Sequence, residues 1–281
     1  MNEPFGTRLR RAMDRRGPLC VGIDPHPGLL VGWGLTDDVQ GLRRFALGVV
    51  DALGPQIAVL KPQAAFFERH GSAGVAVLEQ VVTGCREVGA LCLVDAKRGD
   101  IGSTMAAYAD AFARDGSPLA GDAVTASPYL GVAALRPLLD LAAGSGRGVF
   151  VLARTSNPEG SGVQLAVDPA GRSVAQSVID EVGLENAGVD RLGSVGVVVG
   201  LTSATGAGRL DLTRLNGPVL APGFGAQGGT ADDLAAAFGA VLPAVLPATS
   251  RDVLRAGPDP VRLRAAAQRA LEGVLAVARA R

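Results

Sequence analysis

Two carboxylates and one ammonium group occur close together in residues 91–105 of this chain. Asp95, Lys97 and Asp100 follow the apolar run Leu91–Val94 directly. Because side chains of an extended strand alternate with a period of two, Asp95 and Lys97 should project to the same face. Carboxylates beside an ammonium keep it protonated, which suits a proton donor and not a Schiff-base lysine. The cluster therefore predicts proton transfer at the end of a strand and argues against a covalent aldolase.

Lysine is scarce in this sequence, so the two lysines that occur stand out. Of the 27 basic residues only Lys61 and Lys97 are lysines, and all the others are arginines. A general richness in Ala, Gly and Arg explains the excess of arginine as a bias of composition, but it does not explain why two lysines are kept. Arginine stays protonated in proteins, whereas a lysine ammonium can give up a proton. We therefore expect both lysines to have a specific role.

The composition limits the classes of protein to consider. The chain has 281 residues, and the 48% of them that are hydrophobic predict a substantial core. The formal net charge of +0 predicts no basic surface for nucleic acid. It lacks both an apolar run of about 18 residues and the apolar core of a signal peptide, so we expect a cytoplasmic protein without a membrane partner. Three cysteines without a C-x-x-C pair and two histidines predict no metal site.

Short apolar runs alternate with segments of helical periodicity along the whole chain. The expected strands are residues 19–24, 57–61, 91–97, 121–126, 148–153, 194–199, 218–221 and 245–249. The expected helices are residues 5–16, 37–53, 64–88 with a break near Gly71, 102–114, 130–143, 172–186, 231–238 and 258–280. Runs that are apolar throughout are typical of strands buried on both faces, so the pattern predicts an α/β protein, a (β/α)₈ TIM barrel with residues 1–281 in a single domain. An open doubly wound sheet is the alternative, but regular units without a domain break favour closure.

Polar residues follow the expected strands, at the end where such barrels carry their active sites. These residues are Asp24, Lys61, Asp95, Lys97, Ser127, Arg154 to Ser156, Ser250 and Arg251. A Gly-rich segment, residues 222–229, follows the seventh expected strand, and Arg251 follows the eighth. Gly-rich loops expose backbone N–H groups, and the loops after strands seven and eight commonly hold phosphate in this fold. Arg251 would add a forked cationic contact, so the sequence predicts a phosphate site there.

Together these residues resemble the orotidine 5′-phosphate decarboxylase family, and most closely its longer bacterial, type 2 subgroup. The resemblance rests on Asp24, Lys61, residues 95–104, residues 155–158, residues 222–229 and Ser250-Arg251. It spans nearly the whole chain, and the Asp-x-Lys-x-x-Asp spacing is its most specific part. The resemblance implies a carbon–carbon lyase that converts orotidine 5′-phosphate to UMP and CO₂, the last step of de novo UMP synthesis. It also implies a homodimer with shared active sites and neither a metal nor an organic cofactor.

The resemblance also implies roles for individual residues. Lys97 would protonate C6 of the pyrimidine as CO₂ leaves, while Asp95 would lie against the substrate carboxylate and hold Lys97. Asp100, Ile101 and Thr104 would reach the site of the neighbouring subunit. The implied substrate contacts are Asp24 and Lys61 at the ribose, Ser156 and Pro222 at the pyrimidine, and Gln227, Ser250 and Arg251 at the phosphate.

Two other functions remain open from the sequence. A metal-dependent decarboxylase or aldolase of sugar phosphates would need an acidic ligand set, typically with Glu after the second strand, where this chain has Pro62-Gln63. A nucleotide-binding protein without catalysis would not require the Asp-Lys-Asp cluster. Shorter family members carry Gly-Arg where this chain has Ser250-Arg251. The loops 25–36 and 201–217 are longer here and have no assigned role, and residues 127–131 are expected to form a wall of the pocket.

Overall fold

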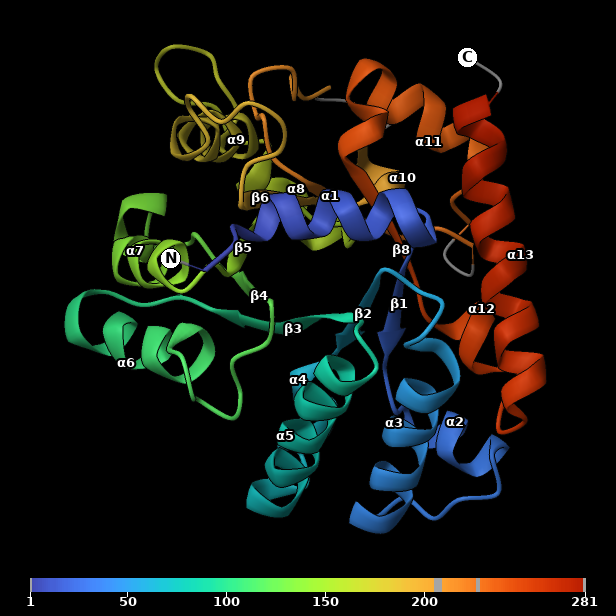
Figure 1. Cartoon of the computed structure of the whole chain (residues 1–281). Coiled ribbons are helices and arrows are strands. Elements are labelled where there is room, and N and C mark those ends of the chain that lie inside the picture. The colour runs from blue at the N-terminus through green and yellow to red at the C-terminus, as the bar shows by residue number, and fades with distance from the viewer. Residues whose placement is uncertain (1, 205–208, 226–227, 280–281) are drawn as a thin grey trace.

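The computed structural model describes residues 2–204, 209–225 and 228–279, and its strands form a closed parallel barrel (Figure 1). The strands are β1 (Cys20–Ile23), β2 (Val59–Pro62), β3 (Leu91–Arg98), β4 (Ala123–Ala126), β5 (Gly148–Arg154), β6 (Val195–Val199), β7 (Val219–Pro222) and β8 (Val245–Thr249). Each strand pairs with the next one in sequence, and β8 closes the barrel on β1, where Cys20 is in register with Ala248. The predicted (β/α)₈ TIM barrel is confirmed, and the open sheet is excluded.

Helices follow the strands and surround them. The longer ones are α1 (Phe5–Arg16), α3 (Val39–Leu53), α5 (Gly71–Glu87), α6 (Gly102–Ala113), α7 (Arg136–Gly144), α9 (Val174–Glu185), α11 (Ala231–Phe238) and α13 (Pro260–Arg279). The shorter ones are α2 (Pro27–Gly32), α4 (Ala64–Glu68), α8 (Ser161–Gln164), α10 (Leu201–Ala204) and α12 (Arg251–Leu254), with 3-10 turns η1 (Val132–Leu135), η2 (Pro158–Gly160) and η3 (Gly239–Ala244). The expected break near Gly71 separates α4 from α5. Helices α2, α8, α10 and α12 were missed because helices this short show no 3.6-residue periodicity.

The core has an outer layer between helices and strands and an inner layer within the barrel. In the outer layer, Asp38 caps the amino-terminal end of α3, where its carboxylate accepts a hydrogen bond from the Gly41 N–H at 2.8 Å. The apolar face of α3 buries Leu42 and Phe45 completely, and burial of such a side chain stabilises the fold by roughly 1.5–3 kcal/mol. In the inner layer, Phe5 of α1 packs edge-to-face on Phe150 of β5 with ring centroids 6.0 Å apart. Helix α1, which crosses in front of the strands in Figure 1, therefore closes the amino-terminal end of the barrel.

The segment 25–36, to which the sequence assigned no role, follows β1, contains α2 and leads to α3. Its Trp33 is buried, and the indole N–H donates to the carbonyl of Leu254 in α12 at 2.8 Å. The Trp33 ring also lies 4.3 Å, centroid to centroid, from that of Phe45 in α3. A structural role for this loop follows from these contacts.

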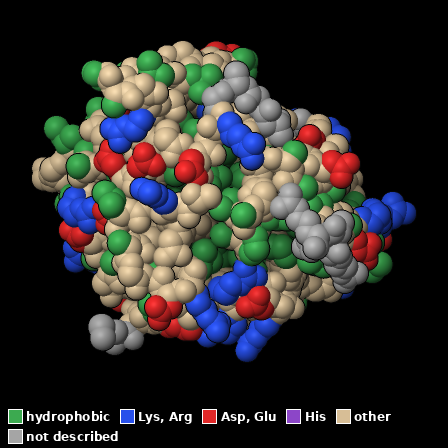
Figure 2. All heavy atoms as spheres, turned by 90° about the horizontal axis from the view of Figure 1, so that it is seen from above, with side chains coloured by type: hydrophobic (Ala, Val, Ile, Leu, Met, Phe, Trp, Pro, Cys, Tyr) green, Lys and Arg blue, Asp and Glu red, His purple; other side chains and the backbone are tan. Residues whose placement is uncertain are grey.

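The surface carries its charges in a mixed pattern. On the face seen in Figure 2, blue basic and red acidic side chains are interspersed among other groups. Among the described residues, some ion pairs span one helical turn, such as Arg10–Asp14 and Arg114–Asp110. None of the helices within the described residues is both long and apolar enough to span a membrane.

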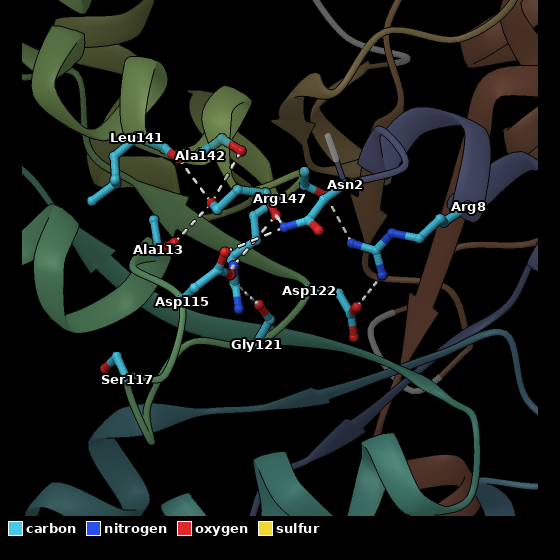
Figure 3. Close-up of polar contacts among 12 residues, drawn as sticks. Asn2, Arg8, Ala113, Asp115, Ser117, Gly121, Asp122, Leu141, Ala142 and Arg147 are labelled. Atoms are coloured by element: carbon cyan, nitrogen blue, oxygen red, sulfur yellow. Dashed lines mark hydrogen bonds and ion pairs between the residues drawn. The ribbon is translucent and has the colours of Figure 1, made fainter.

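A polar network joins the elements at the amino-terminal end of the barrel (Figure 3). The carboxylate of Asp122 pairs with Arg8 and also accepts a hydrogen bond from the Cys92 N–H at 2.8 Å. Arg8 donates in addition to the carbonyl of Gly146 at 2.8 Å. The network thus ties α1 to β3 and to the segment before β5. In barrels of this type, polar residues at this end contribute to stability and not to catalysis.

Replacement of Asp122 should therefore destabilise the protein and leave its activity intact. Asp122→Ala leaves the Arg8 guanidinium and the Cys92 N–H without this acceptor, so the free energy of unfolding should fall by about 1–3 kcal/mol. Urea unfolding would measure this loss, and kcat should stay within about twofold of wild type because the network lies opposite to the end where such barrels carry their active sites. Asp115→Ala is the matched control, since Asp115 also pairs with an arginine, Arg147, but is more exposed. An equal loss for both variants would contradict the prediction.

Candidate active site

A pocket of about 510 Å³ opens at the carboxyl-terminal ends of the strands. Apolar side chains of three strands, Leu152, Val198 and Leu220, line part of it. The predicted site residues that line it are Asp24, Lys61, Asp95, Lys97, Ser156, Pro222, Ser250 and Arg251. Residues in or directly after all eight strands therefore meet in one cavity, although they are far apart in the sequence.

The centre of the pocket is an ion-paired cluster around Asp95. One carboxylate oxygen of Asp95 lies 3.0 Å from Lys61 Nζ, and the other lies 2.6 Å from Lys97 Nζ. The hydroxyl of Thr125 donates a third hydrogen bond to the carboxylate at 2.8 Å. Asp95 and Lys61 are buried, at 7% and 6% exposure. The carboxylate is therefore fixed in position between two ammonium groups.

The charges of this cluster stabilise one another. Burial by itself would raise the pKa of Asp95, but the ammonium groups of Lys61 and Lys97 outweigh burial and hold this pKa well below its ordinary value. Burial likewise disfavours the ammonium of Lys61, but the nearby carboxylates of Asp95 and Asp24 together outweigh burial and raise the pKa of Lys61. Asp95 is thus a carboxylate and Lys61 an ammonium at neutral pH, so the pocket presents a permanent negative charge beside positive ones.

Of the two lysines, Lys97 is the more exposed to the pocket. Its side chain is 44% exposed, against 8% for Lys61. The backbone of Lys97 lies in the left-handed region, with φ of 50°, a conformation that costs a residue with a Cβ roughly 1–2 kcal/mol. The pairing of β3 with β4 is irregular between Val94 and Arg98, which lets the chain take this conformation. The strand end is therefore built to direct the Lys97 ammonium into the pocket.

Two further polar residues, Gln63 and Asp24, line the pocket. Gln63, which follows β2, donates from its side-chain amide N–H to the carboxylate of Asp95, and its amide oxygen accepts a hydrogen bond from Lys97 Nζ at 3.3 Å. The buried oxygen Oδ1 of Asp24 has no hydrogen-bond partner among the described residues. A buried polar atom without a partner costs about 1–3 kcal/mol, so Asp24 is ready to accept a hydrogen bond from a ligand. The described residues contain no group of three or more His, Cys, Asp and Glu side chains that could hold a metal ion.

The loops after β7 and β8 form one rim of the pocket. Gly223 and Gly225 have positive φ of 106° and 82°, and the Gly225 N–H donates to the carbonyl of Gly229 at 2.9 Å. The positive φ of Gly225 favours glycine, and a Cβ there would also lie 1.9 Å from Oδ2 of Asp252, which would have to move. Arg251 is exposed at the start of α12 and lines the same pocket. The arrangement suits an anionic group at this rim.

Comparison with known proteins identifies the family. A family model described as orotidine 5′-phosphate decarboxylase / HUMPS matches residues 17–267. The chain belongs to this family. It is 64% identical over 269 residues to the orotidine 5′-phosphate decarboxylase of Salinispora arenicola, with 96% of each chain covered. It is 60% identical over 267 residues to that of Streptomyces coelicolor, with 95% of each chain covered.

A solved structure agrees with this assignment to the orotidine 5′-phosphate decarboxylase / HUMPS family. The crystal structure of a candidate orotidine 5′-phosphate decarboxylase from Streptomyces avermitilis superposes with a TM-score of 0.95 and 59% sequence identity. The match covers 98% of this chain and 96% of the other. The bacterial relatives agree with the bacterial subgroup that the sequence resembles.

Three predicted site residues in the described part of the chain do not line the pocket. Asp100, Ile101 and Thr104 lie outside its lining, and Ile101 is 62% exposed. The carboxylate of Asp100 accepts a hydrogen bond from the Ile101 N–H at 2.8 Å. Gln227 lies outside the described residues. The sequence predicts a cluster of Asp95, Lys97 and Asp100 at one strand end. Within the pocket, the cluster instead consists of Asp95 between Lys61 and Lys97.

The pocket also contains residues that the sequence did not indicate as functional. His26 lines it beside the predicted residues, as do Asn157 and Phe224, which belong to segments of the resemblance but had no assigned role. Thr125 donates a hydrogen bond to Asp95 directly. The sequence feature that could have indicated Thr125 is its hydroxyl within the otherwise apolar segment that follows Asp122. Residues 127–131, expected as a pocket wall, are not among the lining residues.

Proposed function

We infer that the chain is an orotidine 5′-phosphate decarboxylase, which releases CO₂ from orotidine 5′-phosphate and forms UMP. The observation that carries this inference is the buried carboxylate of Asp95 between the ammonium groups of Lys61 and Lys97. Family membership and relatives that are 57–64% identical support the same reaction. The chemistry of the pocket agrees, because loss of CO₂ from the substrate develops negative charge that a fixed ammonium can stabilise.

The reaction that we propose uses Lys97 as the proton donor. When the bond between C6 and the carboxylate breaks, CO₂ leaves and the electron pair stays on C6. The ammonium of Lys97 stabilises this charge and transfers a proton to C6, which gives UMP and a neutral amine that regains its proton from water. Asp95 holds Lys97 at 2.6 Å and sets a negative charge beside the substrate carboxylate. This repulsion disappears as CO₂ leaves, so it favours the transition state over the bound substrate.

We propose that the other lining residues bind the nucleotide. The unpartnered oxygen of Asp24 supports a hydrogen bond from a ribose hydroxyl, with Lys61 nearby. Ser156 and Pro222 would contact the pyrimidine, and Ser250 and Arg251 the phosphate at the Gly-rich rim. Gln227, also proposed at the phosphate, lies outside the described residues.

The direct test is the reaction itself. Purified protein treated with EDTA is incubated with orotidine 5′-phosphate, and the pyrimidine absorbance is followed. We expect turnover that EDTA does not reduce. Turnover that requires added metal would favour the rival reading, a metal-dependent enzyme of sugar phosphates, and binding of UMP without turnover would favour a nucleotide-binding protein.

Arg251→Ala should weaken substrate binding more than it slows the chemical step. A charge-assisted contact to phosphate contributes about 1.5–3 kcal/mol, so KM should rise about 10- to 100-fold. Steady-state kinetics would separate this rise from a smaller change in kcat. Arg262→Ala is the matched control, since Arg262 lies on the surface of α13 with 79% of its side chain exposed. An unchanged KM for Arg251→Ala would count against a role at the phosphate.

We further propose that two copies of the chain form a dimer and share their sites. Ile101, Tyr129 and Leu130 are apolar residues with 62%, 81% and 53% of their surface exposed. Their two segments are neighbours, because a Cβ at Gly99 would lie 2.3 Å from the carbonyl oxygen of Ser127. An exposed apolar patch of this kind supports a protein contact. A second copy at this patch could direct its own Asp100 into the neighbouring pocket.

Mixing two inactive variants tests the shared site. Equal amounts of Asp100→Ala and Lys97→Ala protein should recover about a quarter of the wild-type activity, since half of the dimers are mixed and each has one intact site. The control mixes Lys97→Ala with Asp95→Asn, which should recover nothing because both residues belong to the same chain's pocket. The measurement is CO₂ release after subunit exchange. No recovery in the first mixture, with exchange shown to be complete, would contradict sharing.

A further inference from the structure

Thr125 links the two residues that we propose for catalysis through a single hydroxyl. Its Oγ1 donates a hydrogen bond to Oδ1 of Asp95 at 2.8 Å and accepts one from the backbone N–H of Lys97 at 2.9 Å. Thr125 lies in β4 and is 1% exposed. A hydroxyl has one donor and two acceptor positions, so both bonds can form together.

The hydroxyl replaces a backbone bond that the sheet does not make at this point. The pairing of β3 with β4 runs from Leu93 with Ala123 to Val94 with Val124 and resumes only at Arg98 with Ala126. Lys97 falls in the irregular part, where its φ is 50°. The N–H of Lys97 is partly buried, and an N–H that is shielded from water without an acceptor is unfavourable, so Thr125 supplies the acceptor from the neighbouring strand.

We propose that Thr125 is a positioning residue that fixes both the Asp95 carboxylate and the left-handed backbone of Lys97. It thereby holds the Lys97 ammonium where it can donate a proton to C6 of the substrate. The proposal rests on the proposed decarboxylation. Thr125 differs from Asp95 and Lys97 in its proposed role. It positions these two residues and needs no contact with the substrate itself. Both bonds depend on one hydroxyl group, so a single substitution tests both.

The matched variants are Thr125→Val and Thr125→Ser. Valine has nearly the shape of threonine but lacks the hydroxyl, whereas serine keeps it. Thr125→Val should lower kcat by about 10- to 100-fold, because a small displacement of a reacting group has effects of this order. The affinity for UMP, measured by titration calorimetry, should change by less than about threefold, and Thr125→Ser should keep kcat within about threefold of wild type.

A second measurement follows the backbone and does not depend on turnover. Hydrogen exchange of the Lys97 amide should be at least about tenfold faster in Thr125→Val than in wild type or Thr125→Ser, since the acceptor of this N–H is lost. Three results would overturn the proposal: a kcat of Thr125→Val near wild type, a parallel loss of kcat and UMP affinity, or a Thr125→Ser variant as slow as Thr125→Val. An inactive wild type would overturn the proposed function and this role with it, whereas unaffected variants of an active wild type overturn the role alone.

Discussion

Lys97→Ala should abolish the release of CO₂ while UMP still binds. The variant loses both the charge that stabilises the developing carbanion and the proton that C6 receives, so kcat should fall by at least about 10⁴-fold. Its fold should persist, because Lys97 is 44% exposed and Asp95 keeps its ion pair with Lys61. Product formation from orotidine 5′-phosphate measures the first effect, and calorimetric titration with UMP measures the second.

Lys97→Arg separates the two contributions of the lysine. Arginine keeps a positive charge near the pocket, but its guanidinium does not give up a proton in proteins. This variant should therefore also be inactive, although its affinity for anionic ligands should stay closer to wild type than that of Lys97→Ala. Turnover by Lys97→Ala close to wild type would remove Lys97 from the mechanism.

The barrel could be predicted because its signals are local. A strand buried on both faces is apolar over its whole length, and β8 was predicted at Val245–Thr249, where the structure has it. Acidic and basic residues directly after such runs, as at Asp95 and Lys97, must lie at one end of a parallel barrel. The class of the fold and the place of the chemistry both follow from this pattern.

The contacts within the site could not be predicted, because they depend on the register between strands. The Lys61–Asp95 ion pair forms because β2 and β3 pair with Val59 opposite Leu91, and no local feature of the sequence gives that register. The sequence suggested that Lys97 lies near Asp100, which follows it by three residues. The left-handed backbone of Lys97 and the hydroxyl of Thr125 are likewise products of the irregular pairing of β3 with β4.

Asp95→Asn should affect both catalysis and stability. The amide keeps the shape of the carboxylate but removes the fixed negative charge, so kcat should fall by at least about 1,000-fold. It also leaves the buried ammonium of Lys61 without its ion pair, and breaking a buried pair in this way costs about 3–5 kcal/mol. Because the pKa of Asp95 is lowered in the folded state and that of Lys61 is raised, the pair stabilises the wild type between their ordinary values of 3.8 and 10.5. This contribution is lost as the pH falls through the lowered pKa of Asp95 or rises through the raised pKa of Lys61.

The double variant Asp95→Asn/Lys61→Met distinguishes the two effects. It removes the unpaired ammonium, and neutral replacement of both members of a buried pair is often neutral or stabilising. Urea unfolding at neutral pH should therefore show that the double variant regains most of the stability lost in Asp95→Asn. Its kcat should stay as low as that of the single variant, because the negative charge beside the substrate carboxylate is still absent. Recovery of activity together with stability would mean that Asp95 serves only to fold the pocket, and the proposed repulsion of the substrate carboxylate would then be wrong.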